Sequence, residues 1–284
     1  MTRYLITGGT GMLGTDLNAA LGGRDVTSLA RDDLDITDFE AVRSAVAGHD
    51  VIINTAAYTR VDDAETDEVA ANLVNAIGPG YLARAAAENG ATLVQLSTDY
   101  VFDGTAKTPY REDTPVNPVS AYGRTKAEGE RLALELNPGR THIVRTAWLY
   151  GEHGGNFART MLDLATRLDT VSVINDQAGQ PTWTADLAKQ IVTLLDSGAP
   201  AGVYHGTSSG ETTWYGFARA VFAEAGLDPD RVTPTDSSQF VRPAPRPAYS
   251  VLGHDAWEKV GLSPIRPWEN ALHDAFARGA LGAG

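Results

Sequence analysis

The chain has 284 residues, of which 43% are hydrophobic, and this is enough for a sizeable core in one large or two coupled α/β domains. Its formal net charge of −13 disfavours nucleic-acid binding, because nucleic-acid binders concentrate lysine and arginine on their surface. There is no cysteine, which excludes disulfides, thiolate catalysis and cysteine-ligated metals.

The chain begins almost directly on a short apolar run, Tyr4 to Ile6, and lacks the basic region and apolar core of a signal peptide. No segment approaches about 18 uninterrupted apolar residues, the length that a membrane-spanning helix needs. We therefore expect a cytoplasmic protein with no membrane or nucleic-acid partner. Any anionic ligand must be held by local groups, since the chain as a whole is acidic.

A glycine-rich turn follows the first predicted strand, residues 3–7, and leads into a predicted helix. Its glycines fit G-x-x-G-x-x-G, with Gly8, Gly11 and Gly14, and also G-x-G-x-x-G, with Gly9 in the first place. Between a strand and a helix, this spacing is typical of dinucleotide binding, because small residues let the backbone approach a pyrophosphate at a helix N-terminus. We expect a nicotinamide dinucleotide here. The helix is expected over residues 16–21.

The second predicted strand, residues 26–29, is followed by Ala30 and Arg31 and has no acidic residue at its tip. A carboxylate there would bind the ribose hydroxyls of NAD, whereas an arginine can accept the 2′-phosphate of NADP. Arg31 therefore favours NADPH. NADH stays open, because Asp35 and Ile36 can form the rim of the adenine site instead.

Two further predicted strands deliver polar or small residues to the same edge of a sheet. Residues 50–54 run into the small residues Thr55 to Ala57, and residues 91–97 run into Thr98. Ligands bind at the carboxyl ends of strands in such sheets, so the Thr98 hydroxyl can hydrogen-bond a substrate oxygen. Helices are expected over residues 39–46 and 68–88, the second interrupted or kinked near Gly78-Pro79-Gly80.

Tyr122 and Lys126 are four residues apart among helix formers, so both side chains should project from one helix face. The ammonium should lower the pKa of the phenol and make it a usable proton donor or acceptor. Such a pair also occurs on ordinary solvated helices. Its position after the Thr98 strand, in a doubly wound parallel sheet of five βα units, gives it functional weight.

The pattern becomes irregular after Trp148. A helix is expected over residues 156–168, a strand over 171–174, and helices over 185–196 and 213–225. We predict a Rossmann domain of residues 1–146, to which 183–204 return, and a smaller α/β substrate lobe of residues 147–182 and 205–284.

Two features of this lobe suit an anionic, polar ligand. The turn from Asp176 to Thr182 is rich in hydrogen-bonding side chains, among them Gln177. Arg246 lies in a proline-rich segment, and its planar guanidinium suits bidentate contact with phosphate. A solvated linker arginine is the alternative for Arg246.

The sequence does not support a zinc site or a serine hydrolase. The six histidines are scattered without i, i+4 pairs, and no G-x-S-x-G elbow is present. We therefore predict no metal site from the spacing of ligating residues.

Together, the glycine turn, the Thr98 strand end and the Tyr122/Lys126 pair resemble the extended short-chain dehydrogenases/reductases, and within them the dTDP-4-dehydrorhamnose reductase branch. The resemblance covers nearly the whole chain. Its specific motifs are GGTGMLG from Gly8, LDITD from Leu34, AYTRVDDAE from Ala57, STDYVFDG from Ser97, RTAW from Arg145, NFARTM from Asn156, NDQAGQPT from Asn175 and RPAYSVL from Arg246.

The resemblance implies NADPH-dependent reduction of the C4 keto group of a dTDP-4-keto-6-deoxyhexose, first of all dTDP-4-dehydrorhamnose to dTDP-L-rhamnose. It implies Thr98, Tyr122 and Lys126 as catalytic residues. With Gly14 and Arg31 from the patterns above, the expected cofactor residues are Gly8, Gly11, Met12, Leu13, Gly14, Arg31, Asp35, Ile36, Ala56, Ala57, Tyr58, Tyr122 and Lys126. The expected substrate residues are Thr59, Val61, Thr98, Asp99, Tyr100, Tyr122, Trp148, Gln177 and Arg246.

The chain departs from the family pattern at two positions. Tyr249 stands where the family usually has asparagine, and Thr55 stands where it often has alanine. Some members bind Mg²⁺ through glutamates at a dimer interface, one of them at the position of Asp16. The resemblance thus leaves open both Mg²⁺ binding and the choice between monomer and homodimer.

Three other functions of this fold stay open. One is reduction of a related dTDP-4-keto sugar in antibiotic deoxysugar synthesis, and a second is nucleotide-sugar epimerisation with retained NAD. A 4,6-dehydratase also shares the fold but is disfavoured, because Tyr100 stands in the place of its glutamate base. The third is a non-catalytic regulatory relative, like the β subunit of methionine adenosyltransferase. The complete Thr98, Tyr122 and Lys126 set speaks against the third.

Overall fold

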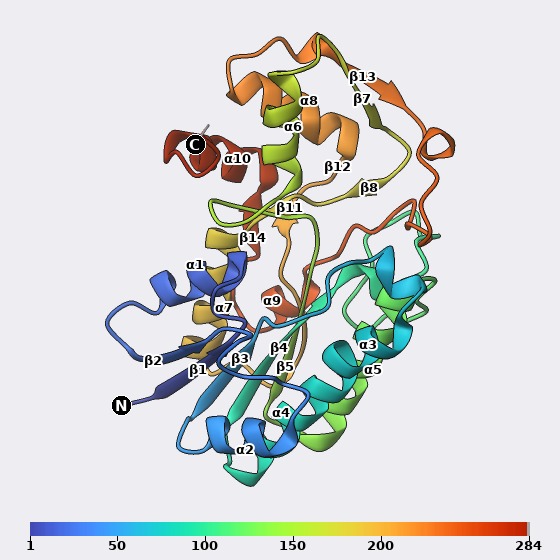
Figure 1. Cartoon of the computed structure of the whole chain (residues 1–284). Coiled ribbons are helices and arrows are strands. Elements are labelled where there is room, and N and C mark those ends of the chain that lie inside the picture. Colours follow the sequence, from blue (N-terminus) through green and yellow to red (C-terminus); the bar gives the residue numbers. More distant parts are fainter. Residues whose placement is uncertain (283–284) are drawn as a thin grey trace.

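The computed structural model describes residues 1–282, and its centre is a parallel sheet of six strands in the order β10-β5-β4-β3-β1-β2 (Figure 1). All neighbouring strands in it are parallel. The strands are β1 (Arg3–Thr7), β2 (Asp25–Leu29), β3 (Val51–Asn54), β4 (Thr92–Thr98), β5 (Thr141–Thr146) and β10 (Gly202–His205). The order reverses at β1, which confirms the predicted doubly wound sheet and makes a switch point where ligands bind.

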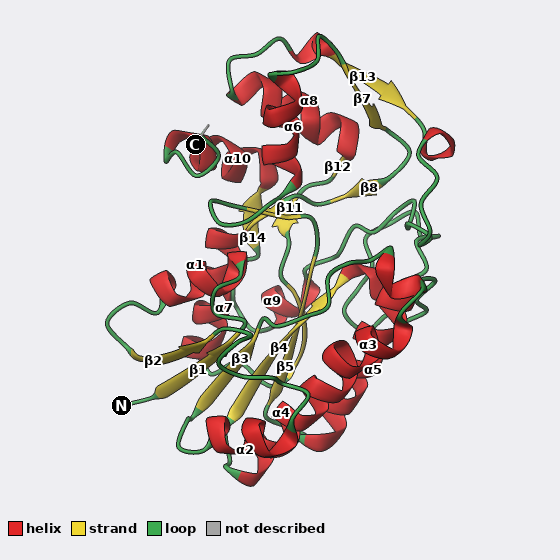
Figure 2. Cartoon of the chain, in the orientation of Figure 1, coloured by secondary structure: helices red, strands yellow, loops and turns green. Residues whose placement is uncertain are grey.

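Helices cover both faces of this sheet (Figure 2). On one face α1 (Met12–Ala20) packs against α7 (Thr184–Ser197). The other face carries α2 (Phe39–Val46), α4 (Gly78–Glu88) and α5 (Ala121–Leu136). The first helix begins at Met12, directly on the glycine turn, and not at Asp16 as predicted.

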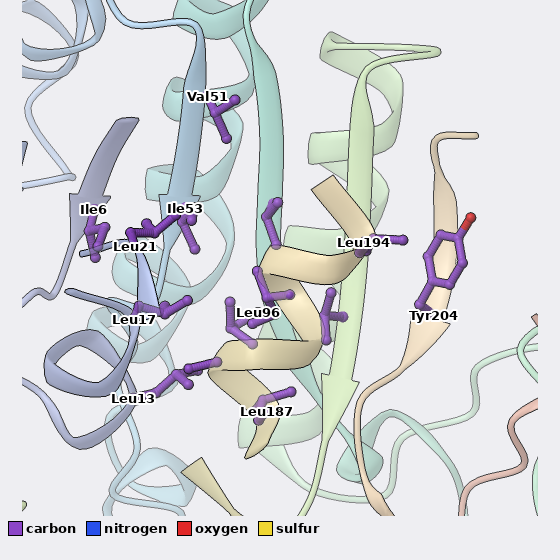
Figure 3. Packing of buried hydrophobic residues seen from close by; sticks show 14 of the residues in the cluster. Ile6, Leu13, Leu17, Leu21, Val51, Ile53, Leu96, Leu187, Leu194 and Tyr204 are labelled. Atoms are coloured by element: carbon purple, nitrogen blue, oxygen red, sulfur yellow. The ribbon is translucent and has the colours of Figure 1, made fainter. Parts of the chain in front are cut away.

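Alternating strand residues supply the two cores beneath these helices. Ile6 and Ile53 point into the core under α1 and α7, whereas Leu5 and Ile52 point into the core under α2 and α4. Figure 3 shows the first of these cores, with leucines of α1 and α7 packed on the strands. Burial on both faces explains why β1 and β3 have nearly continuous apolar sequences.

The predicted helix over residues 68–88 is interrupted, as expected. It consists of α3 (Glu68–Asn72), a π-helical turn η2 (Leu73–Ile77) and α4. Pro79 has no backbone N–H, so it cannot donate to the carbonyl of Asn75 and the regular ladder is lost just before it.

A second body lies above the carboxyl ends of the sheet in Figure 1 and has its own apolar core. Its main elements are α6 (Phe157–Ala165), β7 (Val171–Ile174), α8 (Trp214–Glu224), β13 (Val232–Thr235) and α10 (Trp268–Ala277). Short segments complete it and join it to the sheet, namely β6 (Leu149–Tyr150), β8 (Ala178–Gly179), β9 (Thr182–Trp183), β11 (Ser208–Ser209), β12 (Thr212–Thr213), α9 (Asp255–Lys259) and β14 (Ile265–Pro267). Among residues 1–282, no helix has the length and apolar character needed to cross a membrane.

Candidate active site

The glycine turn between β1 and α1 is shaped by close backbone contacts. Gly8 has a φ of 72°, and a Cβ there would lie 2.8 Å from the backbone nitrogen of Ala56. A Cβ on Gly14 would lie 2.4 Å from the carbonyl oxygen of Gly8. In the described chain no side chain caps the helix at Gly11, so the first amides of α1 are available to an anion.

Polar side chains that are buried or half-buried hold this turn against the ends of the strands. The Thr55 hydroxyl lies 2.8 Å from the carbonyl oxygen of Thr7 and 3.1 Å from that of Gly8, and donates to them. The Thr7 hydroxyl donates to Asn54 Oδ1 at 2.6 Å, and Asn54 Nδ2 donates to Gln95 Oε1 at 2.8 Å. The Thr55 hydroxyl therefore fixes the position of the glycine turn, and an alanine at this position could not form these hydrogen bonds. The sequence analysis did not predict a role for Asn54 and Gln95, although polar residues within apolar strands are a visible signal.

The expected cofactor residues beyond the turn lie at the ends of β2 and β3. Arg31 is exposed just after β2. Hydrogen bonds from the Thr37 amide and hydroxyl hold the pKa of Asp35 below its usual value, and the charge of Arg31 adds to this. Ile36 and Leu13 are core side chains, so Leu13 can offer only its backbone to a ligand.

Asn75, in the π-helical turn, orders the loop that follows β3. Its Oδ1 accepts from the Tyr58 amide at 2.8 Å, and its Nδ2 lies 3.1 Å from the Tyr58 carbonyl oxygen and 3.2 Å from Thr125 Oγ1. This loop carries Thr59, which is exposed, and Val61, which is half-buried. Asn75 thus ties the expected substrate loop to α5, and the sequence reading missed it because the contact is not local.

The three expected catalytic residues come together at the carboxyl end of β4. Ser120 caps α5 by accepting from the Gly123 amide at 3.1 Å, which starts the helix just before Tyr122. Lys126 is buried and donates from Nζ to the Leu96 carbonyl oxygen at 2.6 Å. The Thr98 hydroxyl donates to Asp99 Oδ1 at 2.9 Å.

The predicted lowering of the Tyr122 pKa is wrong. Burial raises the pKa of Tyr122 to about 12, with a smaller opposing effect from the Thr98 hydroxyl. Loss of hydration disfavours the phenolate, and Lys126 points to the Leu96 carbonyl, so its charge does not offset this. Burial also lowers the pKa of Lys126 to about 8. The phenol is therefore fully protonated at neutral pH and poised as a proton donor.

Asp99 and Tyr100 line the site next to this group. Asp99 is 2% exposed, and burial raises its pKa to about 6. The Tyr100 ring meets the Tyr122 ring edge-on, with 5.6 Å between centroids, and the Arg246 guanidinium lies 5.9 Å from the centre of the Tyr100 ring. Arg246 Nη2 is 3.0 Å from Asp62 Oδ1, so this arginine is anchored at the site and is not a solvated linker residue.

A cavity of about 710 Å³ opens beside Tyr100 and Arg246. Its wall is mainly apolar and comes from α6, β7, Trp214 of α8 and the segment 237–246. Gln177 also lines it and donates from Nε2 to Ser237 Oγ at 3.0 Å. The cavity thus collects three of the expected substrate residues, and its size suits a nucleoside-sized ligand.

Trp148 is held in an unusual conformation near this cavity. Its φ is 46°, and its indole stacks on that of Trp214 with 3.6 Å between ring centres and 12° between planes. A Cβ on Gly179 would come within 2.5 Å of the Trp148 ring. Trp214 lines the cavity, and the sequence did not single it out, because an aromatic residue in the first turn of a predicted helix usually belongs to a core.

Asp16, the position at which the family resemblance leaves Mg²⁺ binding open, is half-buried on α1, and burial raises its pKa. Over residues 1–282 the structure contains no group of three or more His, Cys, Asp or Glu side chains arranged to hold a metal ion.

Comparisons with known proteins agree with this geometry. The family described as RmlD substrate binding domain matches residues 2–280. The dTDP-4-keto-6-deoxy-D-glucose reductase of Streptomyces niveus is 52% identical over 278 residues, covering 96% of each chain. The dTDP-4-dehydrorhamnose reductase of Streptomyces griseus is 51% identical over 282 residues, covering 96% of this chain and 93% of that protein.

A solved structure is similarly close. The dTDP-4-dehydrorhamnose reductase of Bacillus anthracis, in complex with NADP, superimposes with a TM-score of 0.94 at 37% identity, covering 98% of this chain and 100% of that one. The predicted resemblance is confirmed, and the chain belongs to the RmlD substrate binding domain family.

Proposed function

We propose that the protein reduces the C4 keto group of a dTDP-4-keto-6-deoxyhexose with NADPH, and that dTDP-4-dehydrorhamnose is the substrate. The observation that carries this proposal is the meeting of Thr98, Tyr122 and Lys126 beside a cavity that Arg246 borders. Relatives that match nearly the whole chain are named as reductases of such sugars, which supports the same reaction.

The glycine turn fits the pyrophosphate of the cofactor. Side chains at Gly8 and Gly14 would fill the cradle, and the free amides at the start of α1 suit the negative charge. Arg31 would bind the 2′-phosphate, and the NADP complex of the Bacillus anthracis relative supports NADPH over NADH. When bound, NADPH supplies the hydride that goes to C4.

Tyr122 would donate its proton to O4 as that oxygen gains charge. Its raised pKa keeps the phenol protonated before the reaction, and Lys126 would stabilise the phenolate left behind and bind the nicotinamide ribose. Thr98, at the end of β4, is placed to contact the same oxygen. Solvent then returns the proton to Tyr122.

Substrate recognition would divide between charge and apolar contact. Arg246 would bind the diphosphate in place of part of its contact with Asp62, while the nucleoside occupies the cavity and the sugar lies against Trp148 and Tyr100. Thr59, Val61, Asp99 and Gln177 would complete this set.

The same arrangement supports a division of labour within the chain. We assign cofactor binding to residues 1–146 with 183–204, because β10 extends the six-stranded sheet and α7 packs on α1. Residues 147–182 and 205–284 would form the substrate lobe, whose core is separate.

A related sugar is the second candidate substrate, since the relative from Streptomyces niveus is named for dTDP-4-keto-6-deoxy-D-glucose. Tyr249, whose hydroxyl donates to Glu211 at 2.9 Å, is the departure from the family pattern nearest the Gln177 loop. It would distinguish the two sugars by the shape of the pocket.

The test is NADPH oxidation with enzymatically prepared dTDP-4-dehydrorhamnose, followed by NMR identification of the product. Formation of dTDP-L-rhamnose is the expected result. Another C4 epimer would assign the protein to a different deoxysugar. Tightly retained NAD with no net oxidation would point to an epimerase, and cofactor binding without turnover on any 4-keto sugar would contradict the enzymatic proposal.

A further inference from the structure

Helix α5 carries a third titratable side chain, Glu130, on the face that holds Tyr122 and Lys126. Glu130 follows Lys126 by four residues, so the three side chains repeat at the spacing of one helix face. Glu130 is buried, and Arg145 forms a bidentate ion pair with its carboxylate, with Nε 2.9 Å from Oε1 and Nη2 2.7 Å from Oε2. A buried ion pair therefore lies one helical turn from the catalytic lysine.

Arg145 connects this pair to the strand that ends in Thr98. It lies on β5 in register with Ser97 of β4, the residue before Thr98. Its Nη1 is 3.4 Å from His205 Nε2 on β10, and its guanidinium lies 5.0 Å from the centre of the Phe102 ring. His205 Nδ1 is 2.8 Å from the Gly253 carbonyl oxygen, so this nitrogen is the donor and Nε2 faces Arg145 as an acceptor.

We propose that Glu130 and Arg145 are positioning residues for Lys126. Arg145 neutralises the carboxylate, so the lysine ammonium keeps its bond to the Leu96 carbonyl and is not drawn one turn along the helix toward Glu130. The ammonium then stays at the carboxyl end of β4, where Thr98 and Tyr122 also lie. This inference rests on the role proposed above for Lys126.

The surroundings of Lys126 contain few other charges that could act in this way. Burial is the main cause that lowers the pKa of Lys126, and Glu130 raises it. On α3, Glu68 is exposed and paired with Arg124. The buried or half-buried titratable groups on the elements around Lys126 include Tyr122 and Glu130 of α5, Asp99 after β4, Arg145 and His142 of β5 and His205 of β10, and burial keeps both histidines neutral. The other charged residues of α5 form surface pairs, Arg124 with Glu68 and Arg131 with Glu128 and Glu135, and Glu65 accepts from the Ala121 amide.

The chain has four lysines, so titration of Lys126 can be followed directly by NMR of protein labelled with ¹³C at the lysine ε-carbon, with Lys126→Met to assign the signal. Glu130→Gln should move the midpoint to lower pH by about one unit, because a neighbouring negative charge is lost. Arg145→Met should move it to higher pH by a similar amount, and the double variant should titrate close to wild type.

The matched control is Glu128→Gln, the same change on the same helix at a half-exposed residue that pairs with Arg131. It should leave the Lys126 midpoint in place. The inference is overturned if Glu130→Gln titrates like this control, or if the two single variants shift in the same direction. Should Arg145→Met fail to fold, the comparison of Glu130→Gln with Glu128→Gln decides the matter.

The titration uses the protein without cofactor or substrate, so its result is separate from the proposed function. A wild type that does not reduce a 4-keto sugar would refute the function and leave the titration interpretable. If the wild type is active, turnover is also measured as a function of pH. In each variant, the pH at which turnover changes on the alkaline side should shift in the same direction as the NMR midpoint of Lys126. The same alkaline pH dependence in wild type and all variants would contradict the positioning role.

Discussion

Asp99 is a carboxylic acid that the fold keeps almost free of solvent. It is 2% exposed, and burial raises its pKa from 3.8 to about 6. At neutral pH the residue is therefore charged in surroundings that disfavour the charge. Strongly shifted groups of this kind gather at functional sites, and Asp99 adjoins both Thr98 and Tyr100.

Asp99→Asn should stabilise the folded protein at neutral pH. Because the folded-state pKa is above the unfolded one, the native state binds more protons between about pH 4 and 6, and stability from this group is lost as pH rises through that window. Asparagine does not ionise, so this loss of stability does not occur in the variant. Its free energy of unfolding should exceed that of the wild type by up to about 3 kcal/mol at pH 7.5 and should equal it near pH 4. Urea unfolding at both values measures this, and an equal difference at both would contradict it.

Tyr122→Phe should reduce turnover by about 10² to 10⁴, the scale of a lost general acid. NADPH affinity should stay within about threefold of wild type, because the phenol hydroxyl contributes little to cofactor binding. Steady-state kinetics and a fluorescence titration with NADPH check the two parts. Turnover close to wild type would refute the role of Tyr122.

At the level of single residues, spacing predicted which side chains meet but not their ionisation. Tyr122 and Lys126 share a helix face because of local geometry, which the sequence specifies. The pKa of Tyr122 depends on how much water the surrounding chain removes, and Lys126 bonds a carbonyl that lies 30 residues earlier. Neither quantity is present in a local pattern.

Helix α5 owes its position to two glycines that lie directly on neighbouring backbone. A Cβ on Gly123 would be 2.2 Å from the Tyr100 carbonyl oxygen, and one on Gly129 would be 2.1 Å from the Asn75 carbonyl oxygen. The helix therefore approaches both the end of β4 and the π-helical turn more closely than any side chain would allow.

Gly129→Ala should push α5 away from the π-helical turn. The added methyl group meets a backbone oxygen, so we expect a loss of about 1–3 kcal/mol and a parallel fall in turnover as Tyr122 and Lys126 move. Thermal unfolding and kinetics measure both effects. Gly155→Ala is the control, since nothing lies within 4 Å of its Cβ position. Equal behaviour of the two variants would contradict this account of the helix.

Element boundaries show where local patterns stop being sufficient. The Gly78-Pro79-Gly80 run predicted an interruption, and Pro79 explains it by its missing N–H. The π-helical turn also places Asn75, whose side-chain amide binds the loop after β3. Such a contact between distant segments cannot be read from spacing.

On the scale of the whole molecule, the two bodies are joined through a buried polar cluster around Gln180. Gln180 Oε1 accepts from the Thr207 hydroxyl at 2.9 Å and from the Leu252 amide at 2.8 Å, while Nε2 donates to the Leu252 carbonyl. Three chain segments that cross between the sheet and the upper body therefore depend on one side chain.

Gln180→Ala should weaken substrate binding more than cofactor binding. It leaves buried groups of Leu252 unpaired, which should destabilise the protein by about 1–3 kcal/mol and loosen the upper body over the sheet. KM for the sugar nucleotide should rise severalfold, while Kd for NADPH changes little. The control is Gln190→Ala on α7, which removes an exposed hydrogen bond from the Gln190 side chain to the Ser263 carbonyl. Equal changes in KM for the sugar nucleotide and in Kd for NADPH would contradict the role of the Gln180 cluster in joining the two bodies.

The sheet and its switch point were predictable, because strands and helices alternate in the sequence. The cavity was predictable only in part, since its wall combines residues from α6, β7, α8 and the segment 237–246. Gln177 and Arg246 could be predicted as ligand-binding residues, because their side chains form hydrogen bonds and, for Arg246, carry a positive charge. Trp214 and Phe157 could not, because aromatic residues at the start of a helix usually belong to a core.

The most direct test follows the hydride itself. NADPH carrying deuterium at its transferable C4 position is incubated with dTDP-4-dehydrorhamnose and the protein, and the product is examined by NMR. We predict deuterium at C4 of dTDP-L-rhamnose, formed at least about 100-fold more slowly by Tyr122→Phe. Absence of deuterium from C4, or equal rates for the two proteins, would contradict the proposed reaction.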